Sequence, residues 1–445
     1  MAFTEYQAVQ LNALRELINP EQWITHNFME WFSVYDHAVV ARDLDFVSWD
    51  YYPADKGLNL MNSGSAHDFF RGLKRKRFWL METQPGCVNW AGVNPHLPKG
   101  GSSLNIWHAI GHGAAAALFW QWRRGRGGQE QYHGSIVNEA GDPRPLYQEV
   151  VQLGEEIAGL QDILCDAQFS PPVAMIFQQD DRWAIDFQRH HRNFDPLKHF
   201  QCYYRGIREQ HCMVDILPDA GDLDSYQIVI CPSLHLMKDG LSQKLTEFVR
   251  AGGTLILGPR SGARNEENTW PGEPLPLELS KLAGIQIEEF YALENPVTLK
   301  SGGSTKIWAE QLALRSERVE IWDEFEAPEH HWLHLHPAIT CHPVGKGKVV
   351  TIAGWLDEHS LKNVLQRCMK ASGIESPFQG TDPLLEICSF ESQGKTFWIL
   401  LNPTGEELGF QCSIPVREYK TAEGNSCKHS VVPYQKKILT KVESP

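Results

Sequence analysis

The sequence predicts an α/β protein in three regions, and three observations lead to this prediction. Over residues 1–163, short apolar stretches alternate with stretches of helical spacing. A similar alternation runs over residues 170–374, after the proline-rich segment Ser170–Pro172. Over residues 376–445, apolar residues alternate as they do in strands. Strands that alternate with helices form parallel sheets covered by helices, whereas strands alone form sandwiches or barrels.

The first region is predicted to form four strand–helix units of a (β/α)8 TIM barrel. Polar or aromatic residues follow each predicted strand, as they do at the carboxyl-terminal mouth of such a barrel. A complete barrel has eight units and typically ~250 residues, so we interpret the region as half of one. The predicted strands are Trp23–Phe28, Phe46–Trp49, Phe78–Met81 and Ala116–Trp120, and the predicted helices are Tyr6–Leu17, Ala66–Lys74, Leu104–Ala114 and Arg144–Gln161.

The second region is predicted to be an open, doubly wound α/β domain, and the third a small β-sandwich. No Gly-rich phosphate-binding motif is present, which disfavours nucleotide binding. Cys231 ends a strand as a nucleophile does, but Pro232 follows it and no glycine flanks it, so we expect a buried thiol and disfavour an amidotransferase. The predicted strands are Val173–Phe177, Met213–Leu217, Ile228–Cys231, Thr254–Leu257, Thr396–Leu400 and Phe410–Ile414, and the predicted helices are Lys198–Gln210 and Leu241–Arg250.

The composition argues against several classes of function. The chain has 41 Lys and Arg against 55 Asp and Glu, a net charge of −14 without a clustered basic face, which disfavours a nucleic-acid partner. No apolar run approaches the ~18 residues of a membrane span, and the first residues have no signal-peptide pattern. Ten cysteines without a C-x-x-C pair are typical of a reducing compartment. We therefore expect a cytoplasmic protein with neither nucleic acid nor membrane as a partner.

Glu82 is the strongest candidate for a catalytic residue, because it follows the apolar strand Phe78–Met81. A carboxylate there lies over the mouth of a barrel and faces a bound ligand. Retaining glycosidases use such a carboxylate as the nucleophile that forms a covalent glycosyl-enzyme. A glutamate at a strand end can also pair with an arginine or cap a helix, so both interpretations stay open.

Four further residues are candidates for binding a sugar. Tyr52 ends another strand and can bond the Glu82 carboxylate, although a tyrosine before proline is also typical of a turn. Trp90 can stack on a sugar ring, as can others of the eight tryptophans before residue 134, but tryptophan is equally good core filler. Glu130 and His133 can bind adjacent sugar hydroxyls. They also resemble two metal ligands, but no third ligand of matching spacing is evident, so no metal or cofactor is expected.

Taken together, these motifs resemble those of the β-galactosidases of glycoside hydrolase family 42. The resemblance runs over the whole chain. It rests on Trp23–Met29, Ser48–Pro53, Phe78–Gly86, Val88–Trp90, Phe119–Arg123, the pair Glu130 and His133, and Leu257–Gly262.

The resemblance implies a fold, an activity and a set of roles. The regions would be the second half of the catalytic TIM barrel (1–163), a flavodoxin-like trimerisation domain (170–374) and a C-terminal β-sandwich (376–445). The implied activity is retaining hydrolysis of terminal β-D-galactosyl residues. Glu82 would be the nucleophile, and Tyr52, Trp90, Glu130 and His133 would line the galactose subsite of a homotrimer.

One departure from the family pattern affects the expected activity. The family's acid/base glutamate follows an asparagine well before the nucleophile, and no Asn-Glu pair precedes Glu82. Asn138-Glu139 and Asn265-Glu266 lie too late in the chain to replace it. We therefore expect a fragment that lacks the first half of the barrel, with weak or no activity alone. It would be either a piece of a split enzyme completed by a separately encoded half barrel, or a non-catalytic oligomerisation or sugar-binding subunit.

Overall fold

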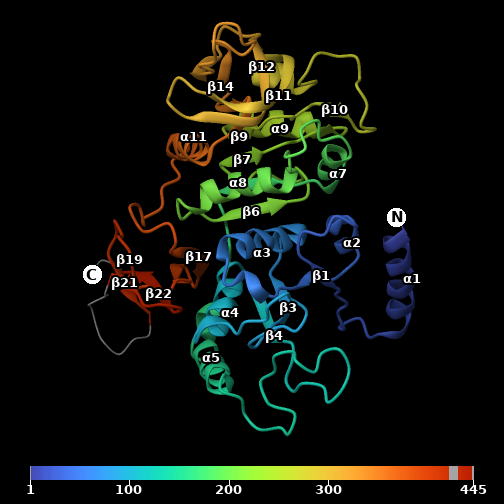
Figure 1. The fold of residues 1–445 in the computed structure, drawn as a ribbon, viewed down its shortest axis with the longest axis vertical. Coiled ribbons are helices and arrows are strands. Elements are labelled where there is room, and N and C mark those ends of the chain that lie inside the picture. The colour runs from blue at the N-terminus through green and yellow to red at the C-terminus, as the bar shows by residue number, and fades with distance from the viewer. Residues whose placement is uncertain (1, 420–428, 443–445) are drawn as a thin grey trace. The chain divides into compact units, whose positions relative to one another are not determined.

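The computed structural model describes residues 2–419 and 429–442, which belong to two compact units (Figure 1). One unit contains Met1–Ser170, His211–Met213 and Ser376–Pro445, and the other contains Pro171–Gln210 and Val214–Glu375. Among the described residues, no helix combines the length and the apolar character that crossing a membrane requires.

The first unit is built on a parallel sheet whose four strands follow one another in chain order, β1-β2-β3-β4. Its core is aromatic: the buried ring of Trp49 stacks on Phe70, with 4.8 Å between centroids. Side chains cap two of the helices, Asp36 at α2 and Asn59 at α3. The elements are α1 (Ala2–Leu17), β1 (Asn27–Met29), α2 (His37–Ala41), β2 (Ser48–Asp50), the 3-10 helix η1 (Ala54–Lys56), α3 (Leu60–Lys74), β3 (Phe78–Thr83), α4 (Gly101–Gly111), β4 (Ala114–Phe119), α5 (Tyr147–Gly159) and α6 (Gln161–Leu164).

Most of these elements differ from the sequence prediction in their bounds, and two of the differences have a local cause. The first strand begins at Asn27, because Trp23 instead packs its half-exposed ring against Phe46 and Trp79. The fourth helix ends at Gly111 and the next strand begins at once, because Gly113 adopts a positive φ of 102° that breaks the helix.

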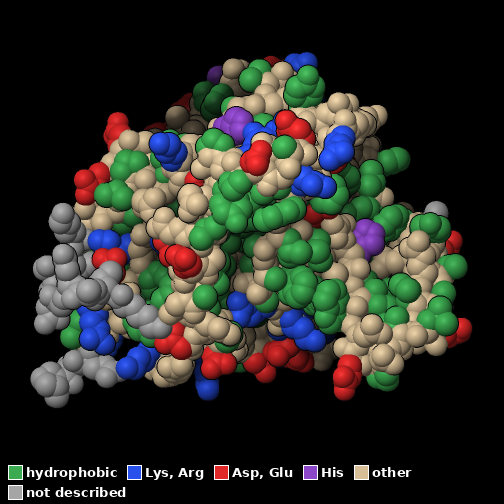
Figure 2. Space-filling view, turned by 90° about the horizontal axis from the view of Figure 1, so that it is seen from below, with side chains coloured by type: hydrophobic (Ala, Val, Ile, Leu, Met, Phe, Trp, Pro, Cys, Tyr) green, Lys and Arg blue, Asp and Glu red, His purple; other side chains and the backbone are tan. Residues whose placement is uncertain are grey.

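Both edges of this sheet are unpaired within the described residues, since β1 pairs only with β2 and β4 only with β3. An apolar groove of about 540 Å³ runs beside β4, between that strand and the helices α4 and α5. Exposed apolar side chains are also frequent on α1, where Tyr6, Val9 and Leu17 are all more than half exposed. Figure 2 views the molecule from the end where α5 lies in Figure 1, and apolar side chains cover much of that face.

The C-terminal strands of this unit form an antiparallel sheet in the order β17-β18-β22-β20 and a two-stranded sheet of β19 and β21. The predicted strand Phe410–Ile414 is wrong: these residues are irregular and Phe410 packs into the core instead. Residues 420–428 and 443–445 of the predicted domain lie outside the described residues. The strands are β17 (Glu386–Ser392), β18 (Lys395–Leu401), β19 (Leu408–Gly409), β20 (Val416–Glu418), β21 (Ser430–Val431) and β22 (Lys436–Lys441).

The second unit contains a seven-stranded sheet in the order β13-β14-β15-β9-β7-β5-β6. Strands β15 to β6 of this order are parallel, and the other two extend the sheet as antiparallel strands. The main elements are β5 (Val173–Ile176), α7 (Gln179–Phe187), α8 (Pro196–Arg208), β6 (Val214–Leu217), β7 (Ile228–Cys231), α9 (Leu241–Ala251), β9 (Thr254–Leu257), α10 (Leu279–Ala283), β13 (Glu320–Glu324), β14 (Pro337–Val344), β15 (Gly347–Ile352) and α11 (Glu358–Ala371).

Smaller sheets complete this unit. One has the order β11-β12-β16, with β11 (Ile285–Thr298), β12 (Ser304–Leu314) and β16 (Gly354–Leu356), and the other pairs β8 (Leu236–Met237) with β10 (Arg264–Asn265). Cys231, at the end of β7, is fully buried as predicted.

Candidate active site

Two carboxyl groups lie side by side at the carboxyl-terminal edge of the parallel sheet in the first unit. Asp50 is the last residue of β2, and it is aligned with Glu82, near the end of β3. Strands in a parallel sheet end at a common edge, so residues of neighbouring strands meet there. The fold therefore brings together two acids that are separated by more than thirty residues of sequence.

Neutral donors hold both oxygens of the Glu82 carboxylate. The hydroxyl of Tyr52 donates to Oε2 over 2.7 Å, and Nδ2 of Asn27 lies 3.3 Å from Oε1. Burial, the hydrogen bond to Glu82 and the Glu82 charge all raise the pKa of Tyr52, which keeps its hydroxyl protonated. Hydrogen bonds to a charged carboxylate fix its orientation and stabilise its charge.

Asp50 has an unusually high pKa for an aspartate. Burial, and then the Glu82 charge, raise its pKa to about 7, although the hydrogen bond from Asn27 lowers it. A carboxyl group whose pKa is strongly shifted by burial and by a neighbouring charge is typical of functional sites.

Aromatic rings surround Tyr52 on two sides. The ring of Trp90 meets it edge to face at a centroid distance of 5.9 Å, and the ring of His133 does so at 5.8 Å. Trp90 is 60% exposed, which leaves a flat indole face open to a ligand, whereas His133 is buried. Glu130 accepts a hydrogen bond from the indole of Trp120 over 3.0 Å and is joined to His133 through the backbone. Tyr52 thus contacts three of the other predicted residues, Glu82, Trp90 and His133, and the fourth, Glu130, lies next to His133.

Buried polar contacts fix the loops that carry these residues. The side-chain amide of Gln84 accepts from the backbone of Ala54 over 2.7 Å and donates to Gly86 over 2.8 Å. Gly134 bonds the backbone of Cys87 at 2.7 Å, where a side chain on residue 134 would collide. The loops after β2, β3 and β4 are therefore tied to one another.

Asn27 and Asp50 are functional candidates that sequence reasoning missed. Both lie in motifs of the resemblance, but neither was given a role. Asp50 ends β2, the strand next to that of Glu82, and Asn27 begins β1, the strand after it in the sheet. This position on consecutive parallel strands is the signal that could have identified them.

Potential metal ligands gather elsewhere. Among the residues that the structure describes, the three side chains whose ligand atoms lie within 4.8 Å of one another are His108, His112 and Glu386, all buried. Glu130 and His133 are not in this group, so the metal interpretation of that pair gains no support.

Parallel strands with carboxyl groups at their carboxyl-terminal ends, beside aromatic rings, are typical of the sites of glycoside hydrolases. Residues 1–160 match the family described as "Beta-galactosidase", and residues 172–375 match the "Beta-galactosidase trimerisation domain". The chain belongs to the β-galactosidases of glycoside hydrolase family 42.

Known relatives agree with this family. The chain is 31% identical to the β-galactosidase Bga of Halorubrum lacusprofundi over 79% of its own length and 53% of the relative. It is 31% identical to BgaA of Planococcus sp. (strain 'SOS Orange') over 90% of its length and 60% of the relative. The crystal structure of a β-galactosidase from Bacillus circulans sp. alkalophilus matches 99% of the chain and 66% of its own, with a TM-score of 0.92 and 26% identity. The chain thus spans little more than half the length of the curated relatives.

Proposed function

We propose that this chain carries the nucleophile and the galactose subsite of a retaining β-galactosidase. The observation that carries the proposal is the Glu82 carboxylate at the carboxyl end of β3, held by Tyr52 over 2.7 Å. Glu82 attacks the anomeric carbon, the bond to the leaving oxygen breaks, and the sugar stays bound to Glu82 as an ester until water releases it. The names of the relatives, all β-galactosidases, support galactose as the sugar.

The substrate subsite is assigned to Tyr52, Trp90, Glu130 and His133. The exposed indole of Trp90 suits the apolar face of a pyranose. Glu130 offers a carboxylate next to His133, and the two together can accept from and donate to neighbouring hydroxyls.

The acid/base carboxyl of this reaction is proposed to come from a second half barrel that pairs with this one. A retaining glycosidase needs two carboxyl groups about 5–5.5 Å apart on either side of the scissile bond. The unpaired edges of β1 and β4 and the apolar groove beside β4 support such pairing, because exposed edges and apolar patches mark interaction surfaces. Residues 1–163 would then be half of the catalytic barrel, 170–374 the flavodoxin-like trimerisation domain and 376–445 a β-sandwich.

The proposal is tested by trapping the nucleophile. A 2-deoxy-2-fluoro-β-galactoside with a dinitrophenyl leaving group needs no acid to depart. We expect the intact mass to rise by one sugar, mapped to Glu82, and the label to be absent in Glu82→Gln. The matched variant Glu139→Gln, at an exposed glutamate, keeps the label. A label on another residue, or none on the wild type, contradicts the proposal.

Two further measurements test the assembly. Acid catalysis contributes roughly 10²–10⁴-fold, so the chain alone should cleave lactose far more slowly than the dinitrophenyl galactoside. Turnover of lactose at the rate of a complete family member would contradict the need for a second half barrel. Light scattering after size-exclusion chromatography should give a trimer, and a monomer would contradict the assigned trimerisation domain.

A further inference from the structure

Asp50 and Glu82 are joined by a single amide nitrogen. Nδ2 of Asn27 lies 3.1 and 3.3 Å from the two carboxyl oxygens of Asp50, and 3.3 Å from Oε1 of Glu82. An amide nitrogen carries two hydrogens, so Asn27 can donate one to each carboxyl. The orientation of the Asn27 side chain is therefore fixed by both acids at once, and a change at Asp50 reaches Glu82 through it.

The groups around Asp50 disfavour a second negative charge at this place. On β3 it faces Glu82, on β1 it faces the neutral amide of Asn27, and the tyrosines that interact with its charge are Tyr52 and Tyr35. The pKa of each tyrosine is raised, mainly by burial, so both stay neutral. Burial and the Glu82 charge together raise the pKa of Asp50 to about 7.

We propose that Asp50 is a positioning residue for the Glu82 nucleophile, and that it acts by orienting the amide of Asn27 toward Oε1 of Glu82. This inference rests on the proposed function of Glu82. The close approach of the two carboxyls also means that protonation of Asp50 responds to the charge of Glu82, which is lost when the sugar ester forms and returns when the ester is cleaved.

A merely structural role makes a different prediction. If Asp50 only closed the end of β2, Asp50→Asn would keep the wild-type rate at which the fluorosugar labels Glu82, whereas loss of a positioning contact slows that rate. The coupling between the two carboxyls is a second property to measure, and it can be measured without substrate.

The experiment is a titration of the full chain labelled with carbon-13 at the aspartate carboxyls, followed by NMR from pH 4 to pH 9. We expect one aspartate signal with a midpoint near 7, absent in Asp50→Asn. In Glu82→Gln the midpoint of this signal should fall by about one pH unit or more, because a neighbouring like charge is removed. In Asn27→Ala it should rise, because a donor to the charged form is lost. The exposed control Asp142→Asn leaves the signal unchanged.

Two outcomes of the titration would overturn the inference. In the first, Asp50→Asn removes no aspartate signal whose midpoint lies above about pH 5. In the second, the midpoint of the Asp50 signal is the same in Glu82→Gln as in the wild type. Thermal melting by circular dichroism checks that each variant is folded. If Asp50→Asn does not fold, the shifts in Glu82→Gln and Asn27→Ala identify the signal. Failure of the fluorosugar to label Glu82 is a separate result that counts against the proposed function, since the titration needs no reaction.

Discussion

Oε2 of Glu82 accepts a 2.7 Å hydrogen bond from the hydroxyl of Tyr52, across the gap between the loop after β2 and the end of β3. The same tyrosine ring contacts Trp90 and His133 edge to face. Tyr52 thus joins the carboxylate proposed as the nucleophile to the rings proposed to bind the sugar. Removal of the Tyr52 hydroxyl should therefore change the orientation of Glu82 and leave the fold unchanged.

Tyr52→Phe should slow the labelling of Glu82 by about 10- to 100-fold, because a hydrogen bond to a charged group contributes roughly 1.5–3 kcal/mol. The phenyl ring keeps the contacts to Trp90 and His133, so the melting temperature should change little. The rate is measured by intact mass against time. Tyr132→Phe, at a tyrosine that is 81% exposed, is the matched control. Equal rates in the two variants would show that the bond does not position Glu82.

Trp90→Ala should weaken the binding of galactosides without unfolding the chain, because the indole is 60% exposed and its loss removes a stacking face rather than core. We expect the concentration of fluorosugar that gives half-maximal labelling to rise about tenfold, while the maximal rate changes less. Trp332→Ala, at another exposed tryptophan, serves as the control. An unchanged concentration dependence would remove Trp90 from the subsite.

Cys231 should be inert to thiol reagents in the folded protein. Its side chain is fully buried, and burial, with the nearby Asp181, raises its pKa, so almost no thiolate forms. Among the cysteines of the described residues, Cys165 is exposed and should react first with N-ethylmaleimide, as mapped by mass spectrometry. Cys165→Ser should remove this early modification, and Cys231 should react only after urea unfolds the chain. Early modification of Cys231 would contradict the expected buried thiol.

The sequence predicts most of the parallel strands, because most of them are short apolar runs closed by polar residues. The parallel strand β15 was not predicted, and the first strand was placed too early in the chain. The strands β5, β6, β7 and β9 are buried along nearly their whole length, and such runs are visible without any partner. The long hairpin of β11 and β12 was not predicted. Its burial follows no regular alternation, and its register shifts twice, so no simple period marks it.

The site was predictable only in part for a related reason. Glu82 lies near the end of β3 and Tyr52 lies just after β2, and a strand end can be found from the sequence. The contacts of Asn27 with Asp50 and Glu82 depend on the register between three strands, which the sequence alone does not determine. Glu386 bonds His112 from 274 residues away, and nothing in either local sequence indicates the partner.

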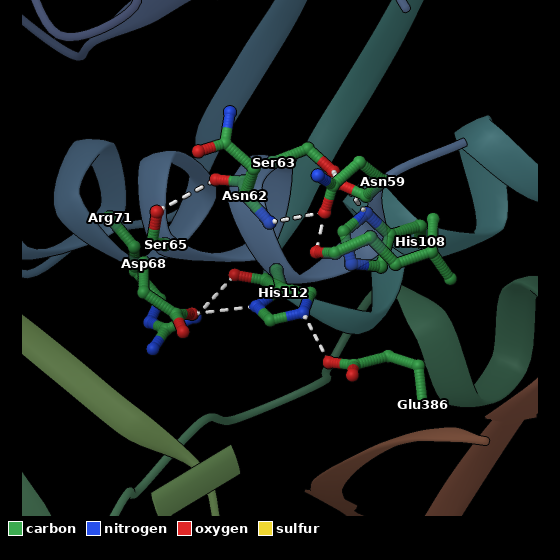
Figure 3. A network of polar contacts seen from close by, with 10 residues as sticks. Asn59, Asn62, Ser63, Ser65, Asp68, Arg71, His108, His112 and Glu386 are labelled. Atoms are coloured by element: carbon green, nitrogen blue, oxygen red, sulfur yellow. Dashed lines mark hydrogen bonds and ion pairs between the residues drawn. The ribbon is translucent and has the colours of Figure 1, made fainter. Parts of the chain in front are cut away.

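A buried ion-pair network around His112 joins α3 and α4 to β17 (Figure 3). Nδ1 of His112 lies 2.8 Å from Asp68, and its Nε2 lies 3.2 Å from Glu386. Arg71 bonds the same oxygen of Asp68 over 2.7 Å and also the backbone carbonyl of His112. Burial disfavours the charged ring, but Asp68 and Cys388 outweigh it, so the pKa of His112 is raised well above its usual value. An imidazolium and a guanidinium thus balance two carboxylates.

The network should therefore make stability depend on pH. A histidine whose pKa is raised on folding stabilises the native state fully below its unfolded pKa of about 6.5 and loses this contribution as the pH rises through its folded pKa. His112→Asn should lower the free energy of unfolding by about 3–5 kcal/mol at pH 6, because it leaves buried carboxylates without their cation. The difference from the wild type should shrink as the pH rises toward 9. Buried histidines of lowered pKa, such as His199 and His235, make stability rise with pH instead. They titrate alike in the wild type and in His112→Asn, so they do not change the difference between the two.

Urea unfolding of wild type and His112→Asn at pH 6, 7, 8 and 9 measures this difference, with the exposed His330→Asn as the control. The control should follow the wild type at every pH, since an exposed imidazole has no buried partner to lose. A difference that stays constant with pH would mean that the ring is neutral in the folded state and acts only through hydrogen bonds. A difference that grows with pH would mean that burial outweighs Asp68, and that the network is held together by Arg71 instead.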